Sequence, residues 1–74
     1  MTVEIEFFGQ LASDHPPRQA LTLAEPVRVG EVVALLSLEP DHIGLITIDG
    51  VQSELHDLVP IDCRLCFFPP MSGG

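Results

Sequence analysis

The first residues of the chain alternate strictly between polar and apolar side chains. In an extended segment successive side chains point to opposite sides, so Val3, Ile5 and Phe7 share one face and two glutamates share the other. This pattern predicts a half-buried strand over residues 2–7. A stretch rich in proline and small polar residues then predicts a loop over residues 9–17.

A second strand is predicted over residues 18–23, with Leu21 and Leu23 directed inward. The predicted loop is short enough for this strand to return beside the first one, so we expect the two to form a hairpin. Pro26 then ends the strand, because proline cannot donate a hydrogen bond to a strand ladder.

One amphipathic helix is predicted next. Gly30 is an acceptable N-cap, and Glu31 stands in the first turn, where the helix dipole favours a negative charge. Pro40 prevents the helix from continuing much beyond Leu38. The apolar stripe that would face a sheet has the i, i+3, i+4, i+7 spacing and consists of Val29, Val32, Val33 and Leu36.

Two further strands complete the pattern. A β-branched apolar run predicts a strand over residues 44–48, closed by a tight Asp-Gly turn, and the mostly polar residues 51–60 predict a connection. Residues 64–68 predict the last strand, which a Pro-Pro pair stops. A hairpin, one helix and further strands in so short a chain predict an α+β domain with a small mixed sheet and the helix packed across one face.

The charge of the chain is strongly one-sided. Eleven acidic residues stand against three arginines and no lysine, for a formal net charge of −8. Nucleic-acid binding needs a basic face that displaces counterions, so we expect no nucleic acid partner. A basic protein partner is the natural complement, and an acidic surface that only keeps the domain in solution is the alternative. No apolar run approaches the roughly 20 residues that span a bilayer, and no secretory signal pattern is present, so we expect a cytoplasmic protein without a membrane segment.

The chain ends in two glycines, Gly73 and Gly74. The Pro-Pro pair before them fixes φ and favours an extended exit, so we predict a domain over residues 1–70 and a flexible tail over residues 71–74. Because glycine has no side chain, such a tail can enter a narrow channel and deliver the carboxylate of Gly74 to a buried active site. The residues predicted to thread this channel ahead of Gly74 are Met71, Ser72 and Gly73.

Three segments of the chain resemble one known family. Residues 67–74, FFPPMSGG, closely resemble the ending of the small subunit of molybdopterin synthase, a sulfur carrier with the ubiquitin-like β-grasp fold. Residues 5–11 are similar to the first strand of that family, and residues 48–51 resemble the strand and turn before its final segment. The resemblance implies a β-grasp fold: a mixed sheet of four to five strands with one main helix packed across it.

The resemblance also implies a mechanism. An E1-like adenylyltransferase would activate the carboxylate of Gly74 with ATP, and a sulfur donor of the cysteine desulfurase or rhodanese type would convert the acyl-adenylate into a thiocarboxylate. The large subunit of molybdopterin synthase would then receive the tail and pass the sulfur to a pterin precursor. The chain itself would bind no cofactor and would contribute no catalytic side chain, so we expect a carrier, the non-catalytic small subunit of a sulfurtransferase, rather than an enzyme.

One sheet face is predicted to dock partners. In the last strand Cys66 and Phe68 lie on the face opposite the expected core, and Phe8 falls out of phase with the buried positions of the first strand. Phe8 and Phe68 are therefore expected to be exposed together, although an ordinary core or rim role is the alternative. By resemblance, the residues that would contact the large subunit and the activating enzyme are Phe8, Val51, Phe68, Pro69 and Pro70.

Two other patterns invite a metal or redox interpretation that we reject. Cys63 and Cys66 have C-x-x-C spacing, but along a strand they point to opposite faces with Cα atoms roughly 10 Å apart, too far for a disulfide. A zinc site would also need two further ligands. The histidines adjoin aspartates without a short ligand spacing, so we predict no metal site and assign to loops His15, His42 and His56.

Three other functions remain open. The chain could carry sulfur for another pathway, of the thiamine or cysteine type. It could be a ubiquitin-like modifier whose Gly74 is joined to lysines of other proteins, or a plain β-grasp interaction module in which the two glycines are incidental. The Phe-Phe-Pro-Pro string at residues 67–70 favours molybdopterin synthesis, because related thiamine carriers generally lack it.

Overall fold

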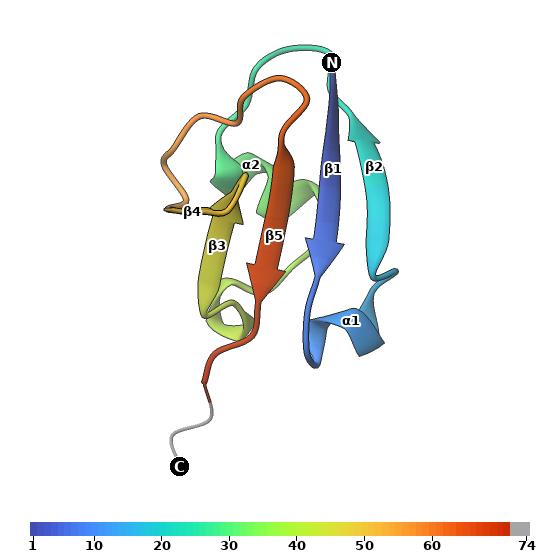
Figure 1. The fold of residues 1–74 in the computed structure, drawn as a ribbon, viewed down its shortest axis with the longest axis vertical. Coiled ribbons are helices and arrows are strands. Elements are labelled where there is room, and N and C mark those ends of the chain that lie inside the picture. The colour runs from blue at the N-terminus through green and yellow to red at the C-terminus, as the bar shows by residue number, and fades with distance from the viewer. Residues whose placement is uncertain (72–74) are drawn as a thin grey trace.

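The computed structural model describes residues 1–71 of the chain. Its elements in chain order are β1 (Thr2–Phe7), α1 (Leu11–Asp14), β2 (Arg18–Thr22), α2 (Val29–Leu35), the 3₁₀ helix η1 (Pro40–His42), β3 (Leu45–Ile48), β4 (Val51–Ser53) and β5 (Arg64–Phe68). The strands form a mixed sheet in the order β2-β1-β5-β3-β4, and α2 packs against one face of it (Figure 1). The predicted α+β fold is confirmed.

Strand β1 links the two parts of the sheet. It pairs antiparallel with β2 and parallel with β5, with Ile5 opposite Leu65 and Phe7 opposite Phe67. Because β1 and β5 run in the same direction, the residues that follow them emerge at the same edge of the sheet (Figure 1). We call this edge the carboxyl edge.

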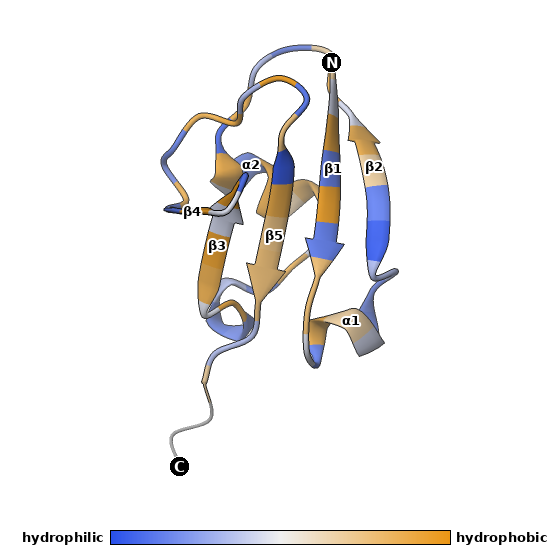
Figure 2. Cartoon of the chain, viewed as in Figure 1, coloured by the Kyte–Doolittle hydropathy of each residue, from blue (hydrophilic) through white to orange (hydrophobic). Residues whose placement is uncertain are grey.

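The core lies between α2 and the sheet face that α2 covers. Phe7 stacks on Phe67 there, with ring centroids 5.6 Å apart. Figure 2 shows hydrophobic and hydrophilic bands alternating along β1, as expected for a strand that is buried on one side. The largest side chains that are fully buried are Phe67, Ile5, Leu65, Val3, Val29, Val32 and Cys63.

Several predicted elements are confirmed. Strands β1 and β5 have the predicted bounds, and β1 and β2 form the predicted hairpin. Strand β2 ends at Thr22, one residue earlier than predicted, yet Leu23 is buried just beyond it and Leu21 packs against the core. Strand β3 begins at Leu45, one residue later than predicted.

The predicted helix exists, but its N-cap is Arg28 and not Gly30. The backbone N–H of Arg28 donates to Oε1 of Glu31 at 3.1 Å, so the glutamate satisfies a donor at the helix start with its own carboxylate. Gly30 lies inside the first turn, where its N–H donates to the carbonyl oxygen of Leu55 at 2.8 Å. Among residues 1–71, no helix combines the length and apolar character that a membrane crossing requires.

Two short elements lie where connections were predicted. Helix α1 occupies a single turn inside the predicted loop over residues 9–17 and buries Leu11. Strand β4 occupies the start of the predicted connection over residues 51–60, after a turn in which Asp49 and Gly50 both have positive φ, 50° and 86°. A turn of this kind matches the twist of the two strands that it joins. All three residues of β4 therefore pair with β3, although the strand is short. Both elements are too short to show a hydrophobic period.

Candidate functional site at the root of the C-terminal tail

The predicted reacting group and most of the predicted tail lie outside the described residues: Ser72, Gly73 and Gly74. Met71 is the last described residue and is 95% exposed. The part of the site that can be described is therefore the root of the tail, where the chain leaves β5 at the carboxyl edge (Figure 1).

Two aromatic rings stack beside this root. Phe8 follows β1, and its backbone N–H donates to the carbonyl oxygen of Phe67 at 3.1 Å, which extends the parallel pairing by one residue. The rings of Phe8 and Phe68 are almost parallel, at 7°, with centroids 4.5 Å apart. Both residues are partly buried, and each ring covers part of the other. We predicted that the two rings are exposed together; the structure brings them together, but each is only partly exposed, and their binding role stays a prediction.

A leucine extends this aromatic surface. Leu45 lies opposite Phe68 in the β3–β5 pairing and is 37% exposed. Side chains that are paired across two strands share a face, so Leu45 adjoins the stacked rings. We call Phe8, Phe68 and Leu45 the apolar platform. Sequence reasoning missed Leu45, because the register between β3 and β5 has no local signal in the sequence.

The two prolines at the root are held by close packing. Each proline lies close to a glycine: a Cβ on Gly9 would lie 2.7 Å from Cγ of Pro69, and a Cβ on Gly44 would lie 2.5 Å from Cα of Pro70. The N–H of Gly44 also donates to the carbonyl oxygen of Phe68 at 2.8 Å. The path of the chain through Pro69 and Pro70 is therefore fixed by its contacts with these two glycines.

Val51 is not brought together with the platform. It is 70% exposed, but it pairs with Ile48, which in turn pairs with the buried Leu65. Residues in one such row share a face of the sheet, so Val51 lies in the row of the helix-covered face, at the opposite end of β3 from Leu45. Its predicted role in partner binding stays a prediction, and any such contact would be separate from the platform.

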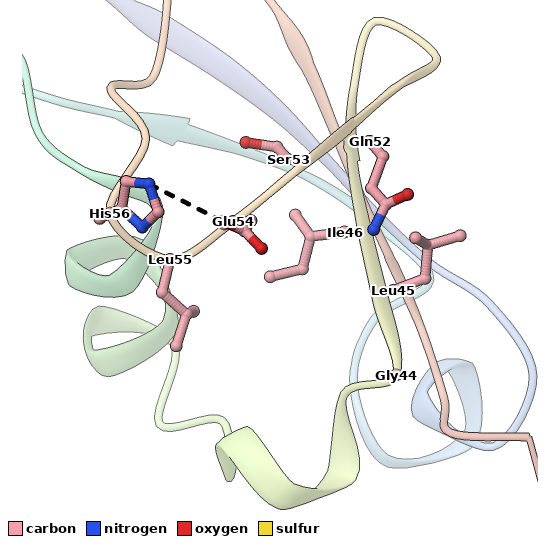
Figure 3. Close-up of a pocket in the computed structure, with 8 residues that line it drawn as sticks. All are labelled: Gly44, Leu45, Ile46, Gln52, Ser53, Glu54, Leu55 and His56. Atoms are coloured by element: carbon pink, nitrogen blue, oxygen red, sulfur yellow. Dashed lines mark ion pairs between the residues drawn. The ribbon is translucent and has the colours of Figure 1, made fainter.

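An open hollow lies between the β3–β4 hairpin and the segment over residues 54–56 (Figure 3). Leu45 and Ile46 border it on one side, and Leu55 and His56 on the other, around a volume of about 400 Å³. His56 Nε2 lies 3.8 Å from a carboxylate oxygen of Glu54, but both side chains are more than two thirds exposed. A charge pair in that much water is weak. The hollow offers surface but no activated group.

Asp57 organises the segment beside this hollow. Its Oδ2 accepts a hydrogen bond from the backbone N–H of Glu54 at 2.9 Å and from the hydroxyl of Ser53 at 2.8 Å. These hydrogen bonds, with smaller contributions from His56 and Arg28, lower the pKa of the Asp57 carboxyl from its usual value. The carboxylate therefore holds the turn after β4.

The two cysteines have different positions: Cys63 lies just before β5, and Cys66 lies within it. Cys63 is 2% exposed within the core, Cys66 is 8% exposed on β5, and both are free thiols. Burial, together with the negative charge of Asp49, raises the pKa of the Cys63 thiol, which makes it a poor nucleophile at neutral pH. Within residues 1–71 no group of three or more histidine, cysteine or acidic side chains is placed to hold a metal ion.

The histidines have three different surroundings. His15 stacks on the core residue Phe7, with ring centroids 4.9 Å apart, and so supports the loop before β2. His42 lies in the 3₁₀ helix rather than in the predicted loop, and His56 lies in the exposed segment described above. His42 lines a hollow at the tail root together with Pro69 and Pro70. Neither His15 nor His56 lines that hollow, so the structure does not bring the three histidines together as one site.

The architecture is that of the ubiquitin-like β-grasp fold: a hairpin, one main helix and a last strand that pairs in parallel with the first. Two solved structures share it. The crystal structure of SAMP1 from Haloferax volcanii matches with a TM-score of 0.77 and 22% identity over 100% of both chains. A structure of H. volcanii small archaeal modifier protein 1 matches with a TM-score of 0.76 and 20% identity over 95% of this chain and 98% of the other. At such identities the likeness establishes the fold.

No protein-family model and no curated protein matches the sequence.

Proposed function

We propose that this protein is a carrier whose working group is the C-terminal carboxylate of Gly74, activated by an E1-like enzyme. The observation that carries the proposal is the arrangement at the carboxyl edge, where the apolar platform adjoins a sterically fixed root four residues before the chain end. A partner that binds the platform has the start of the tail beside it. The described side chains provide a surface and a direction, and the chemistry belongs to the terminal carboxylate.

The reaction follows from the chemistry of a carboxylate. The Gly74 carboxylate attacks the α-phosphorus of ATP, pyrophosphate leaves, and an acyl-adenylate forms. Sulfide, or the terminal sulfur of a persulfide, then attacks the carbonyl carbon, and AMP leaves with the bonding electron pair. With a persulfide donor the product is an acyl disulfide, which a thiol reductant cleaves to the thiocarboxylate.

We propose molybdopterin synthesis as the pathway, with the large synthase subunit as the sulfur acceptor. Support comes from the resemblance of residues 67–74 to the small-subunit ending. The same thiocarboxylate could serve a thiamine-type or cysteine-type pathway, and the sulfur acceptor distinguishes these.

A protein modifier is the second candidate, favoured because one of the similar structures is named a small archaeal modifier protein. In this case an amine of another protein attacks the activated Gly74 and forms an amide. The chain contains no lysine. Attached copies therefore cannot be extended into chains through lysine side chains, and we expect single additions.

Intact-mass spectrometry separates the candidates. The full chain is incubated with ATP, an E1-like enzyme and sulfide, and a carrier gains the mass of one sulfur in exchange for one oxygen. A variant that lacks Gly74 is the control and should gain nothing. Higher-mass conjugates in a cell extract that disappear with the same deletion would support the modifier. If neither product forms, the carrier proposal is wrong.

A further inference from the structure

The backbone at the root of the tail lacks the usual means of being held in a sheet. Pro69 and Pro70 have no N–H, so neither can donate to a strand ladder. Among the described residues, the last backbone hydrogen bond on this segment is the one that the carbonyl oxygen of Phe68 accepts from the N–H of Gly44 at 2.8 Å. Beyond Phe68, the direction of the chain depends on what the prolines touch.

They touch two glycines. A Cβ on Gly44 would lie 2.5 Å from Cα of Pro70 and 2.7 Å from the carbonyl oxygen of Pro69, and both of these are backbone atoms. The backbone of Gly44 is not in the left-handed region, so this position requires glycine for space alone. Gly9 differs, because its φ of +59° favours glycine as well and its close contact is with the ring of Pro69.

We propose that Gly9 and Gly44 form a seat for the prolines that sets the direction in which the chain leaves the sheet, and that Gly44 is a positioning residue for activation of the tail. This inference rests on the proposed carrier function. A methyl group on Gly44 must push Pro70 from 2.5 Å to an ordinary contact of 3.4–4 Å, which shifts the root by about an ångström. A misplacement of that size at a reacting group can reduce a rate by about 100-fold.

The shift should affect catalysis more than binding. The rings of Phe8 and Phe68 stack on each other, with Phe8 directly after β1 and Phe68 at the end of β5, so a partner can still bind the platform when the root moves. The carboxylate would then be presented in the wrong place within a complex of nearly normal affinity. The expected signature is a reduced kcat with an almost unchanged KM for the carrier.

The test compares Gly44→Ala with Gly30→Ala in ATP–pyrophosphate exchange by an E1-like enzyme, with the carrier concentration varied. Gly30 lies in α2, and its Cβ would meet only Leu55, with 3.2 Å to the carbonyl oxygen, so this variant controls for an added methyl group away from the tail. We expect Gly44→Ala to lower kcat about tenfold or more and to change KM less than about twofold. Gly30→Ala should change neither by more than about twofold. Thermal melting of both variants is the check that they are folded.

A second variant tests the steric cause. Adding Pro70→Gly to Gly44→Ala frees φ at residue 70, so the chain can bend around the new methyl group, and kcat should recover severalfold. Wild-type kcat in Gly44→Ala, a rise in KM alone, or a double variant no faster than Gly44→Ala would overturn the inference.

Failure of the two proposals can be distinguished. If the wild-type chain is not activated at all, the carrier function fails together with the positioning role. The seat itself is tested without any enzyme by a nuclear Overhauser effect between the α protons of Gly44 and Pro70 in the full chain. We expect this effect in the wild-type protein, and its absence would refute the seat whatever the enzyme does.

Discussion

The stacked pair at the tail root can be tested as a rigid unit by a double-mutant cycle of Phe8→Ala and Phe68→Ala. The rings are nearly parallel, with centroids 4.5 Å apart, and both residues are partly buried. Truncation of a fully buried phenylalanine costs about 3–5 kcal/mol, so each partly buried ring should cost about 1–2 kcal/mol. Aromatic pairs add about 0.5–1.5 kcal/mol beyond their buried area. We therefore expect the double variant to lose about 1 kcal/mol less than the sum of the single losses.

Urea unfolding followed by far-ultraviolet circular dichroism gives the four free energies of unfolding. A domain of 74 residues has a total stability of about 4–11 kcal/mol, so the double variant should remain folded at 25 °C. Each 1 kcal/mol should lower Tm by about 4–8 °C. Leu45→Ala, on the same surface but outside the stack, is the control for lost apolar area. Losses that add within about 0.3 kcal/mol would refute the stack as an interacting pair, and with it a preformed apolar platform.

Three further outcomes follow from the same contacts. Phe67→Ala removes a ring that is 0% exposed and should cost about 3–5 kcal/mol in urea unfolding, whereas Met71→Ala, at a position 95% exposed, should cost nothing measurable; equal losses would contradict the assigned core. The folded-state pKa of Asp57 is lowered, so the stability that its carboxylate contributes to the fold is present at neutral pH and is lost as pH falls through that pKa. Asp57→Asn should therefore have a lower Tm than the wild-type chain at pH 7, and the difference in Tm should disappear in acid. The folded-state pKa of Cys63 is raised, so the stability that its neutral thiol contributes to the fold is complete at neutral pH and is lost as pH rises through that pKa. The Tm of Cys63→Ala should therefore fall less steeply with rising alkaline pH than the Tm of the wild-type chain. Equal slopes of Tm against pH would contradict a buried neutral thiol.

Local patterns in the sequence determined several features of this protein. Alternation fixes which side chains of β1 and β5 share a face, because successive side chains in a strand point to opposite sides. The apolar stripe predicts α2 because residues at the i, i+3, i+4, i+7 spacing lie on one face of a helix. The N-cap of α2 was predicted wrongly. Arginine is not a favoured N-cap residue, and Arg28 takes this position because its backbone N–H donates to the side chain of Glu31.

The site depends on contacts between distant residues. Alternation of side-chain direction predicts that Phe8 and Phe68 both point away from the core, but only the parallel pairing of β1 with β5 stacks their rings. Register likewise gives Leu45 to the apolar platform and places Val51 in another row, information that no single segment of the sequence contains.

The terminal glycines and the two prolines can be read directly from the sequence, and they indicate a carboxylate on an extended arm. How that arm begins was decided by the tertiary structure. Gly9 and Gly44 matter because they have no side chain, and an absent side chain produces no periodic pattern. Their role becomes visible only when folding brings them to within van der Waals contact of Pro69 and Pro70, because close packing depends on neighbours in space rather than in sequence.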